Sequence, residues 1–273
     1  MNNIYISIIT LTKNDTQKFF RTLKSLKSQT KDFLIEWIIV DGSDFSQYEI
    51  NKKLIHKNFS EENNNFIIKN LNLYKKNISG IYPCMNYGKR LENGKFMIFL
   101  NSGDIFYSYN SLKIFYQNTV DVSPHKSIIF GQANIFSSEK LNWLFPGKRL
   151  KNIERWLRIF EPNHQSMLIS VSLAKNFDFN EKYNLIADGK WKRIIINNAI
   201  DIIYIKTPLV IFFLDGLSSI KPSAKNLKDI LKNNNITLFR KIIFTTKYLI
   251  PKKFFIIYYH LQKYKSLLVD LLL

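Results

Sequence analysis

Ile98-Phe99-Leu100-Asn101-Ser102-Gly103-Asp104 is the stretch of sequence on which the predicted fold depends. The apolar run Phe96 to Leu100, suited to a buried strand, stops at a short polar turn that ends in a carboxylate. In open α/β sheets, ligands bind beyond the carboxyl ends of the strands. We therefore expect Asp104 to lie at such an edge, where a carboxylate can hold a divalent cation against a phosphate. Because Asn, Ser, Gly and Asp are also ordinary turn residues, a purely structural turn is the alternative.

The first 44 residues have the pattern of a strand, a helix and a second strand. Ile4 to Leu11 is rich in β-branched residues, and Phe19 to Leu26 has apolar residues spaced by four and three. The second strand, Trp37 to Val40, ends at Asp41. Right-handed crossovers bring both strand ends to one edge of the sheet. Asp41 can there accept hydrogen bonds from a nucleobase or ribose, and a turn or cap residue is the alternative reading.

The rest of the chain alternates between apolar segments with strand and helix character, which predicts an α/β fold with a mainly parallel sheet. Further strands are predicted at 66–74, 127–132, 135–143 (a longer strand or a hairpin), 167–171, 202–205 and 209–213. Further helices are predicted at 48–59, 84–91, 111–118, 153–160 and from Asp188 onward.

Composition indicates a globular protein with anionic partners. The 273 residues are 46% apolar, and 40 Lys and Arg against 21 Asp and Glu give a net charge of +19. The single cysteine, Cys84, excludes an intramolecular disulfide and fits a reducing compartment. No signal segment or bilayer-length apolar run is apparent, so we expect a cytoplasmic location. A nucleic-acid-binding protein is a rival class, but the sequence has no recognition motif that would support it.

The character of the sequence changes after Gly216, which predicts a catalytic domain at 1–216 and a basic helical region at 217–273. From Lys221 onward, 11 Lys and Arg against Asp229 and Asp270 give a net charge of +9. Apolar residues interleaved with lysine are typical of amphipathic helices that lie on an anionic membrane surface. A helical appendage packed on the domain, or a dimer contact, is the alternative.

Six segments in order resemble one family. Ser7 to Asn14 and Ile38 to Ser43 resemble the opening of family-2 glycosyltransferases, which have the GT-A fold. Gly80-Ile81-Tyr82-Pro83-Cys84-Met85-Asn86-Tyr87-Gly88 and Phe99 to Asp104 are similar to the branch that builds bacterial surface polysaccharides such as colanic acid. His164-Gln165-Ser166 and Ala187-Asp188 match two later motifs of that branch. The resemblance covers residues 4 to about 213 and implies a mixed, mainly parallel sheet flanked by helices, with a C-terminal helical appendage.

The resemblance implies an inverting, metal-dependent transfer of a sugar from a nucleotide-diphosphate sugar to a hydroxyl of a glycan acceptor, which we expect to be lipid-linked. Asp188 matches the general base, and Asp104 matches the last acidic position of the motif that holds Mn²⁺ or Mg²⁺. His164 is a second candidate metal ligand, or a residue that binds the leaving phosphate or hydrogen-bonds within its loop. The residues assigned to the donor nucleotide are Thr10, Thr12, Asp41, Asn86, Arg90 and Ser102.

The sequence also departs from the family pattern. Asn101 and Gly103 stand where many relatives have carboxylates, and Pro83 stands where an acidic residue is usual. A domain that binds nucleotide sugars without turnover is therefore an alternative to the active enzyme. Trp156 and Trp191 could stack on a sugar or pack in the core.

Overall fold

The computed structural model describes residues 4–30, 32–59, 66–73, 78–120, 122–137, 141–183, 187–215, 224–232, 238–251 and 255–272.

The described residues form the following secondary structure. The strands are β1 (Ile6–Thr12), β2 (Ile35–Asp41), β3 (Phe66–Asn72), β4 (Phe96–Phe99), β5 (Ile105–Phe106), β6 (Ser127–Phe136), β7 (Asn142–Phe145), β8 (Met167–Ser170) and β9 (Asp201–Phe213). The helices are α1 (Thr16–Lys27), α2 (Phe45–Asn58), α3 (Ile81–Arg90), α4 (Ser111–Gln117), α5 (Ile153–Ile159), the 3-10 turn η1 (His164–Ser166), α6 (Val171–Lys175), α7 (Ala187–Asn198), α8 (Ala224–Lys232), α9 (Leu238–Leu249) and α10 (Phe255–Leu272).

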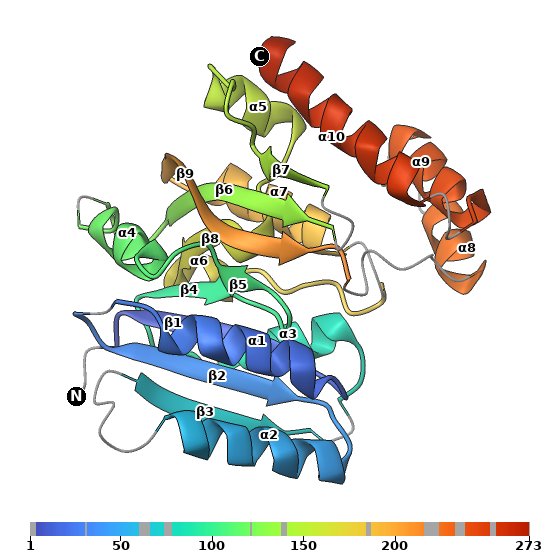
Figure 1. Ribbon diagram of the computed structural model, residues 1–273. Helices are drawn as coiled ribbons and strands as arrows, with labels where there is room; N and C mark the ends of the chain where they lie inside the picture. Colours follow the sequence, from blue (N-terminus) through green and yellow to red (C-terminus); the bar gives the residue numbers. More distant parts are fainter. Residues whose placement is uncertain are drawn as a thin grey trace.

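The strands form one twisted sheet in the order β3-β2-β1-β4-β8-β6-β9-β5, with β7 paired to β6 (Figure 1). Strands β3, β2, β1 and β4 are mutually parallel. Strand β8 runs antiparallel to both β4 and β6, whereas β9 is parallel to β6. The predicted mixed α/β sheet flanked by helices, with a helical C-terminal region, is confirmed.

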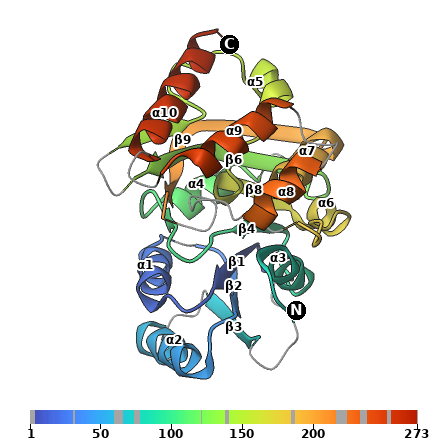
Figure 2. The ribbon, with the colours of Figure 1, turned by 90° about the vertical axis from the view of Figure 1, so that its right-hand side faces the viewer.

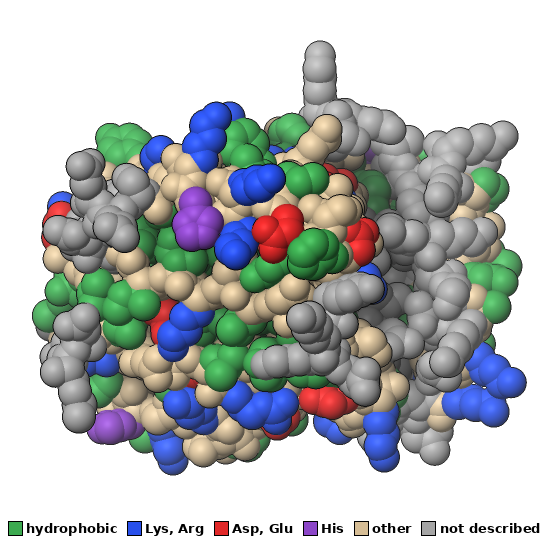
Figure 3. All heavy atoms as spheres, turned by 90° about the horizontal axis from the view of Figure 1, so that it is seen from below, with side chains coloured by type: hydrophobic (Ala, Val, Ile, Leu, Met, Phe, Trp, Pro, Cys, Tyr) green, Lys and Arg blue, Asp and Glu red, His purple; other side chains and the backbone are tan. Residues whose placement is uncertain are grey.

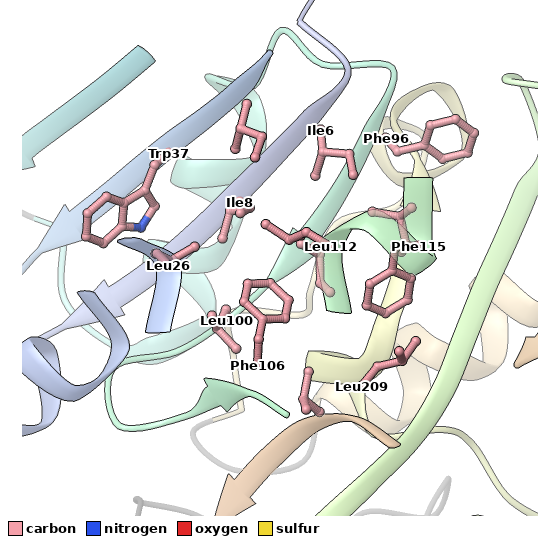
Figure 4. Packing of buried hydrophobic residues seen from close by; sticks show 14 of the residues in the cluster. Ile6, Ile8, Leu26, Trp37, Phe96, Leu100, Phe106, Leu112, Phe115 and Leu209 are labelled. Atoms are coloured by element: carbon pink, nitrogen blue, oxygen red, sulfur yellow. The ribbon is translucent and has the colours of Figure 1, made fainter. Parts of the chain in front are cut away.

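Helices cover both faces of the parallel half of the sheet. Figure 2 shows α1 and α2 on one side and α3 on the other. Successive residues of a strand point to opposite faces, so Ile8 packs in the cluster beneath α1 while Ile9 packs beneath α3. Figure 4 shows the first of these clusters, which includes Trp37, Leu100 and Phe106. Strands buried on both faces explain the continuous apolar runs of the sequence.

Helix α3 packs directly on the sheet because Gly88 has no side chain. A Cβ atom at this position would lie 2.7 Å from Ile9 Cγ2 and 3.0 Å from Val40 Cγ2. The helix axis is therefore closer to β1 and β2 than a larger residue would allow.

Two predicted strands merge in the structure. The segments 202–205 and 209–213 belong to the single strand β9, which shifts its register against β6 where Gln132 pairs with Pro208. Proline lacks the N–H that the ladder needs, so the strand bulges there and then continues. The alternative of a hairpin at 135–143 is realised by β6 and β7. The short strand β5 was not predicted.

The C-terminal helices lie at the β7 end of the molecule, with α10 near α5 (Figures 1 and 2). The predicted boundary at 216/217 lies outside the described residues. None of the helices that the structure describes has the length and apolar character needed to cross a bilayer. Seen from the β3 side, Lys and Arg side chains are spread among acidic and apolar ones over the described part of the surface (Figure 3).

Candidate active site

Polar residues gather at the edge of the sheet where the parallel strands end. Thr12 and Asp41 are the last residues of β1 and β2 and pair with each other in the ladder. The turn from Asn101 to Asp104 follows β4, and its Ser102 amide donates to the Leu11 carbonyl. The motif at η1 contributes His164, which contacts this turn.

Asp188, in the first turn of α7, is surrounded by three polar side chains from different parts of the chain. The Tyr82 hydroxyl donates to Asp188 Oδ1 at 3.1 Å. His164 Nδ1 and Lys192 Nζ lie 4.0 and 3.9 Å from Asp188 Oδ2. The Asp188 side chain is 33% exposed, so the carboxylate remains accessible from solvent.

These neighbours hold Asp188 in its charged form. Burial raises its pKa, but the Lys192 ammonium and the hydrogen bonds from Tyr82 and Gly189 act in the opposite direction, and the pKa is below the ordinary aspartate value. Burial lowers the pKa of His164 to about 4, against the opposing effect of Asp188, so the imidazole is neutral at pH 7. The cluster therefore presents an ionised carboxylate beside a neutral imidazole, an arrangement suited to accepting a proton.

Asp104 has a more enclosed environment than Asp188. It is 5% exposed, its Oδ1 accepts from the Phe213 amide at 3.0 Å, and its Oδ2 accepts from Gln165 Nε2 at 3.0 Å. Burial raises its pKa to about 8, while the hydrogen bonds from Phe213 and Gln165 act in the opposite direction. Its carboxylate bonds to distant segments and not to its own turn, which differs from a simple turn cap.

The two carboxylates belong to one cluster because consecutive residues of η1 contact them. His164 faces Asp188, and Gln165 bonds to Asp104. Asn101 Nδ2 lies 3.4 Å from His164 Nε2, which connects the turn after β4 to the same imidazole. The chain thus brings together three of the predicted site motifs at this edge.

The residues around Asp104 fit a single hard cation. Asn101 Oδ1 and Gln165 Oε1 are buried and have no hydrogen-bond donor, so two amide oxygens are unsatisfied next to a buried carboxyl group. Oxygen ligands of this kind, together with a neutral imidazole, suit Mn²⁺ or Mg²⁺. Among the described residues there is no group of three or more His, Cys, Asp and Glu that could hold a metal ion.

Arg21 of α1 holds the turn in place. Its Nε donates to the Gly103 carbonyl at 2.7 Å, and its guanidinium lies 3.7 Å from the centre of the Phe213 ring. The same guanidinium pairs with Asp215 at 3.1 Å. Gly103 has a φ of +104°, a conformation that side chains rarely adopt, so glycine is required at this point of the turn.

The residues assigned to the donor nucleotide divide into two groups. Thr12 donates to the Ser102 hydroxyl at 3.3 Å, next to Asp41 at the sheet edge. Asp41 is fully buried, with Oδ1 accepting from the Ser43 amide and Oδ2 accepting from Asn51, as the turn alternative requires. Thr10 lies inside the core, where it bonds to the Leu100 carbonyl and Trp37.

Asn86 and Arg90 lie away from this edge. Asn86 is buried and its amide bonds to Phe179 and Glu181, which makes it a support for the 179–181 segment. Arg90 is at the C-terminal end of α3, 58% exposed and 3.8 Å from Asp178. Because α3 runs from the ends of the parallel strands back toward their starts, Arg90 is at the opposite edge of the sheet from the turn at 101–104.

Both tryptophans that were expected either to stack on a sugar or to pack in the core are packed in the core. Trp156 and Trp191 are each 1% exposed, and Trp191 stacks on Phe179 with ring centres 4.3 Å apart.

Three contacts of the site were missed by the sequence reasoning. Tyr82 and Gln165 lie inside segments that carried the family resemblance, but no role was given to them. Lys192 follows Asp188 by four residues in a predicted helix, a spacing that places the two on one face.

Comparison with known proteins shows the class of fold. No family model matches the chain, and no curated protein is similar to it in sequence. Among solved structures, S. aureus TarS 1-349 in complex with UDP-GlcNAc matches 90% of this chain and 72% of its own length, with a TM-score of 0.62 and 17% identity. The mannosyltransferase PcManGT from Pyrobaculum calidifontis, in complex with GDP-Man and Mn²⁺, matches 98% of this chain and 73% of its own, with a TM-score of 0.51 and 12% identity.

The chain spans 43% of the longer S. aureus TarS structure, with a TM-score of 0.58 and 16% identity. At these identities the likeness concerns the fold alone. The predicted GT-A class, a mixed α/β sheet flanked by helices, is therefore the fold of this protein.

Proposed function

We propose that the protein is a glycosyltransferase of the inverting family-2 type. It moves a sugar from a nucleotide-diphosphate sugar to a hydroxyl of a glycan acceptor in the synthesis of a bacterial surface polysaccharide. The observation that carries this proposal is the contact of η1 with both carboxylates, His164 with Asp188 and Gln165 with Asp104. The complexes of structural neighbours with UDP-GlcNAc and GDP-Man support a nucleotide sugar as donor.

Asp188 is the proposed general base. The acceptor hydroxyl must lose its proton as its oxygen attacks the anomeric carbon, and an ionised, partly exposed carboxylate can accept that proton. The hydroxyl of Tyr82 and the cation of Lys192 orient and stabilise the charged form. His164, neutral at pH 7, lies 4.0 Å from the same carboxylate oxygen that Lys192 approaches.

Asp104, Asn101, Gln165 and His164 are the residues that would hold Mn²⁺ or Mg²⁺. When bound, such a cation acts as a Lewis acid that stabilises the negative charge of the departing diphosphate. In the protein alone, burial raises the pKa of Asp104, and the Arg21 guanidinium acts in the opposite direction. The Mn²⁺ complex of the mannosyltransferase supports this assignment.

The donor nucleotide is proposed to lie over the ends of β1 and β2. Thr12 and Ser102 offer hydroxyls at this edge, and the buried Asp41 stabilises the turn on which the nucleobase would rest. Thr10, Asn86 and Arg90 contact other groups of the protein, and the proposed donor site is therefore centred on Thr12 and Ser102.

The membrane is the proposed location of the acceptor, which we expect to be lipid-linked. The outer side of α10 carries exposed apolar residues at helical spacing: Ile257, Leu261, Tyr264, Leu268 and Leu271. With the net charge of +9 after Lys221, this stripe fits the surface of an anionic leaflet on the cytoplasmic side. Flotation with anionic vesicles should fall sharply when Leu261 and Leu268 are both changed to Gln.

The deciding experiment measures thermal stability with a panel of nucleotide sugars and Mn²⁺. A donor that binds the folded state raises the melting temperature in proportion to the logarithm of its concentration. We expect at least one UDP- or GDP-sugar to do so, and to release its nucleoside diphosphate when an acceptor extract is added. Stabilisation that is no larger than with the nucleoside alone, for every sugar, would contradict the proposal. Binding without release would favour the inactive domain.

A further inference from the structure

A cavity of about 380 Å³ lies between α10 and the rest of the molecule. Its walls come from β6, β7, α5, the segment that follows α5, α7 and α10. Six aromatic side chains dominate the lining: Trp143, Phe145, Trp156, Phe160, Tyr258 and Tyr259.

Two lysines contribute cations to this lining. Lys192 reaches it from α7 and Lys265 from α10, where its Nζ lies 5.7 Å from the centre of the Phe160 ring. Glu161 also borders the cavity, but its carboxylate is paired with Arg193 at 2.7 Å. The cavity therefore combines apolar walls with two lysines, of which Lys192 also lies beside Asp188.

Lys192 connects the cavity to the candidate active site. Lys192 lines the cavity, and its ammonium group lies 3.9 Å from Asp188 and donates to the Pro162 carbonyl at 3.0 Å. Asn163, another lining residue, immediately precedes His164. A molecule in the cavity would thus have one end beside the proposed base.

The wall formed by α10 is fixed by a buried carboxylate. Asp270 is 2% exposed, and its Oδ1 accepts from the Gly147 amide at 3.2 Å. A Cβ atom on Gly147 would lie 1.5 Å from Asp270 Oδ2, so only glycine allows this contact. This contact joins the C-terminal end of α10 to the segment that follows β7.

We propose that this cavity binds the apolar chain of an amphiphile with an anionic head, which is the lipid part of the acceptor. The inference rests on the proposed function. Aromatic and aliphatic side chains make up most of the lining and suit a hydrocarbon chain. The lysines suit a phosphate at the head of that chain. Because α10 presents apolar residues outward and a cavity wall inward, one helix serves both the membrane and the acceptor.

The test uses farnesyl phosphate as the probe, with farnesol and glucose 1-phosphate as probes that lack the head or the chain. Trp143 and Trp156 line the cavity, so bound probe should change tryptophan emission without any donor or turnover. We expect saturable binding of farnesyl phosphate, weaker binding of farnesol and none of glucose 1-phosphate. If farnesyl phosphate leaves the emission unchanged in the full chain, the inference is wrong.

Matched variants locate the binding. Ser266→Phe fills the cavity from α10 and should weaken farnesyl phosphate binding at least about tenfold, whereas Leu268→Phe on the exposed side of the same helix should not. Lys265→Gln should weaken farnesyl phosphate several-fold and leave farnesol unchanged, with Lys263→Gln as its control. Equal affinity in Ser266→Phe and Leu268→Phe, with both folded by near-ultraviolet circular dichroism, would refute the cavity as the site.

Donor and cavity measurements separate the two proposals. If nucleotide sugars stabilise the protein but the probe does not bind, the glycosyltransferase proposal stands and the cavity assignment fails. If the probe binds as expected and no nucleotide sugar does, the cavity holds an amphiphile and the proposed function fails.

Discussion

Asp41 and Asp188 represent two regions that are built in opposite ways. Both oxygens of Asp41 are bonded by groups within ten positions of it, and the side chain is fully buried. Asp188 is 33% exposed, and one of its partners, Tyr82, is 106 positions away. The end of β2 is thus a closed structure made by neighbours in sequence, whereas the start of α7 is an accessible charge held by distant segments.

The difference explains which region can perform chemistry. The Asp41 carboxylate is fully buried and bonded within its own turn, so it stabilises that turn and is closed to an acceptor hydroxyl. The Asp188 carboxylate is kept ionised beside the Lys192 ammonium and is partly exposed, so it can accept a proton. Substitutions in the two regions should therefore affect different measurements: stability at Asp41 and turnover at Asp188.

The largest expected effect is on turnover. Asp188→Asn removes the proposed proton acceptor and should lower the transfer rate by about 10²- to 10⁴-fold, with nucleotide-sugar binding retained. Steady-state kinetics with donor and acceptor, beside thermal shift with donor alone, would measure both. Asp32→Asn, at an aspartate that is 65% exposed, serves as the matched control. Transfer at the normal rate in Asp188→Asn would remove this residue from the chemistry.

A large loss of stability is expected from a substitution where α3 packs on β1 and β2. Gly88→Ala places a methyl group 2.7 Å from Ile9 Cγ2 and should lower the free energy of unfolding by up to about 3 kcal/mol. Gly42→Ala has its nearest contact at 3.8 Å and should change stability little. Denaturant unfolding of both variants gives the comparison, and equal stabilities would show that α3 can shift away from the sheet.

A smaller loss is expected from opening the network of Asp41. Asn51→Ala leaves Asp41 Oδ2 without its donor and should lower the free energy of unfolding by about 1–2 kcal/mol. Asn58→Ala, later in the same helix, removes only a bond to the Leu54 carbonyl and is the control. Equal free energies of unfolding for the two variants would show that the contact with Asp41 adds no stability.

The smallest expected effect is a pH dependence at Asp270. Burial raises the pKa of this carboxyl group in the folded protein, so folding favours its protonated form. Its ionisation then costs the folded state stability as pH rises from the ordinary aspartate pKa through the raised value. The stability of Asp270→Asn relative to the natural protein should therefore increase between pH 4 and pH 7, as measured by thermal unfolding. If the difference in stability between Asp270→Asn and the natural protein is constant with pH, the pKa of Asp270 is not raised by folding.

Local patterns account for the parts of the fold that the sequence predicted. The ends of β1, β2 and β4, the turn at 101–104 and the start of α7 follow from apolar runs that stop at polar residues. Asp41 could equally be recognised as a turn residue, because its partner Ser43 is two positions away. Helices α4 and α5 end within one residue of the expected position, whereas α2 begins three residues early because its start depends on the capping contact of Asp44 with Gln47.

Contacts between distant segments could not be predicted in the same way. Asp104 bonds to the amide of Phe213 across 109 positions, and Gly147 bonds to Asp270 across 123. Such pairs depend on how the sheet twists and how α10 packs, which no periodicity encodes. Asn86 and Arg90 show the same limit. Their motif and helical spacing predicted one donor site, but in the structure Asn86 bonds to Glu181 and Arg90 lies near Asp178.

Arg21 has a consequence for motion within the molecule. Because one guanidinium joins Gly103 to Asp215 and covers the Phe213 ring, the turn beside Asp104 and the last residues of β9 form one mechanical unit. A displacement of either of them is transmitted to the other through this guanidinium and through the hydrogen bond from the Phe213 amide to Asp104.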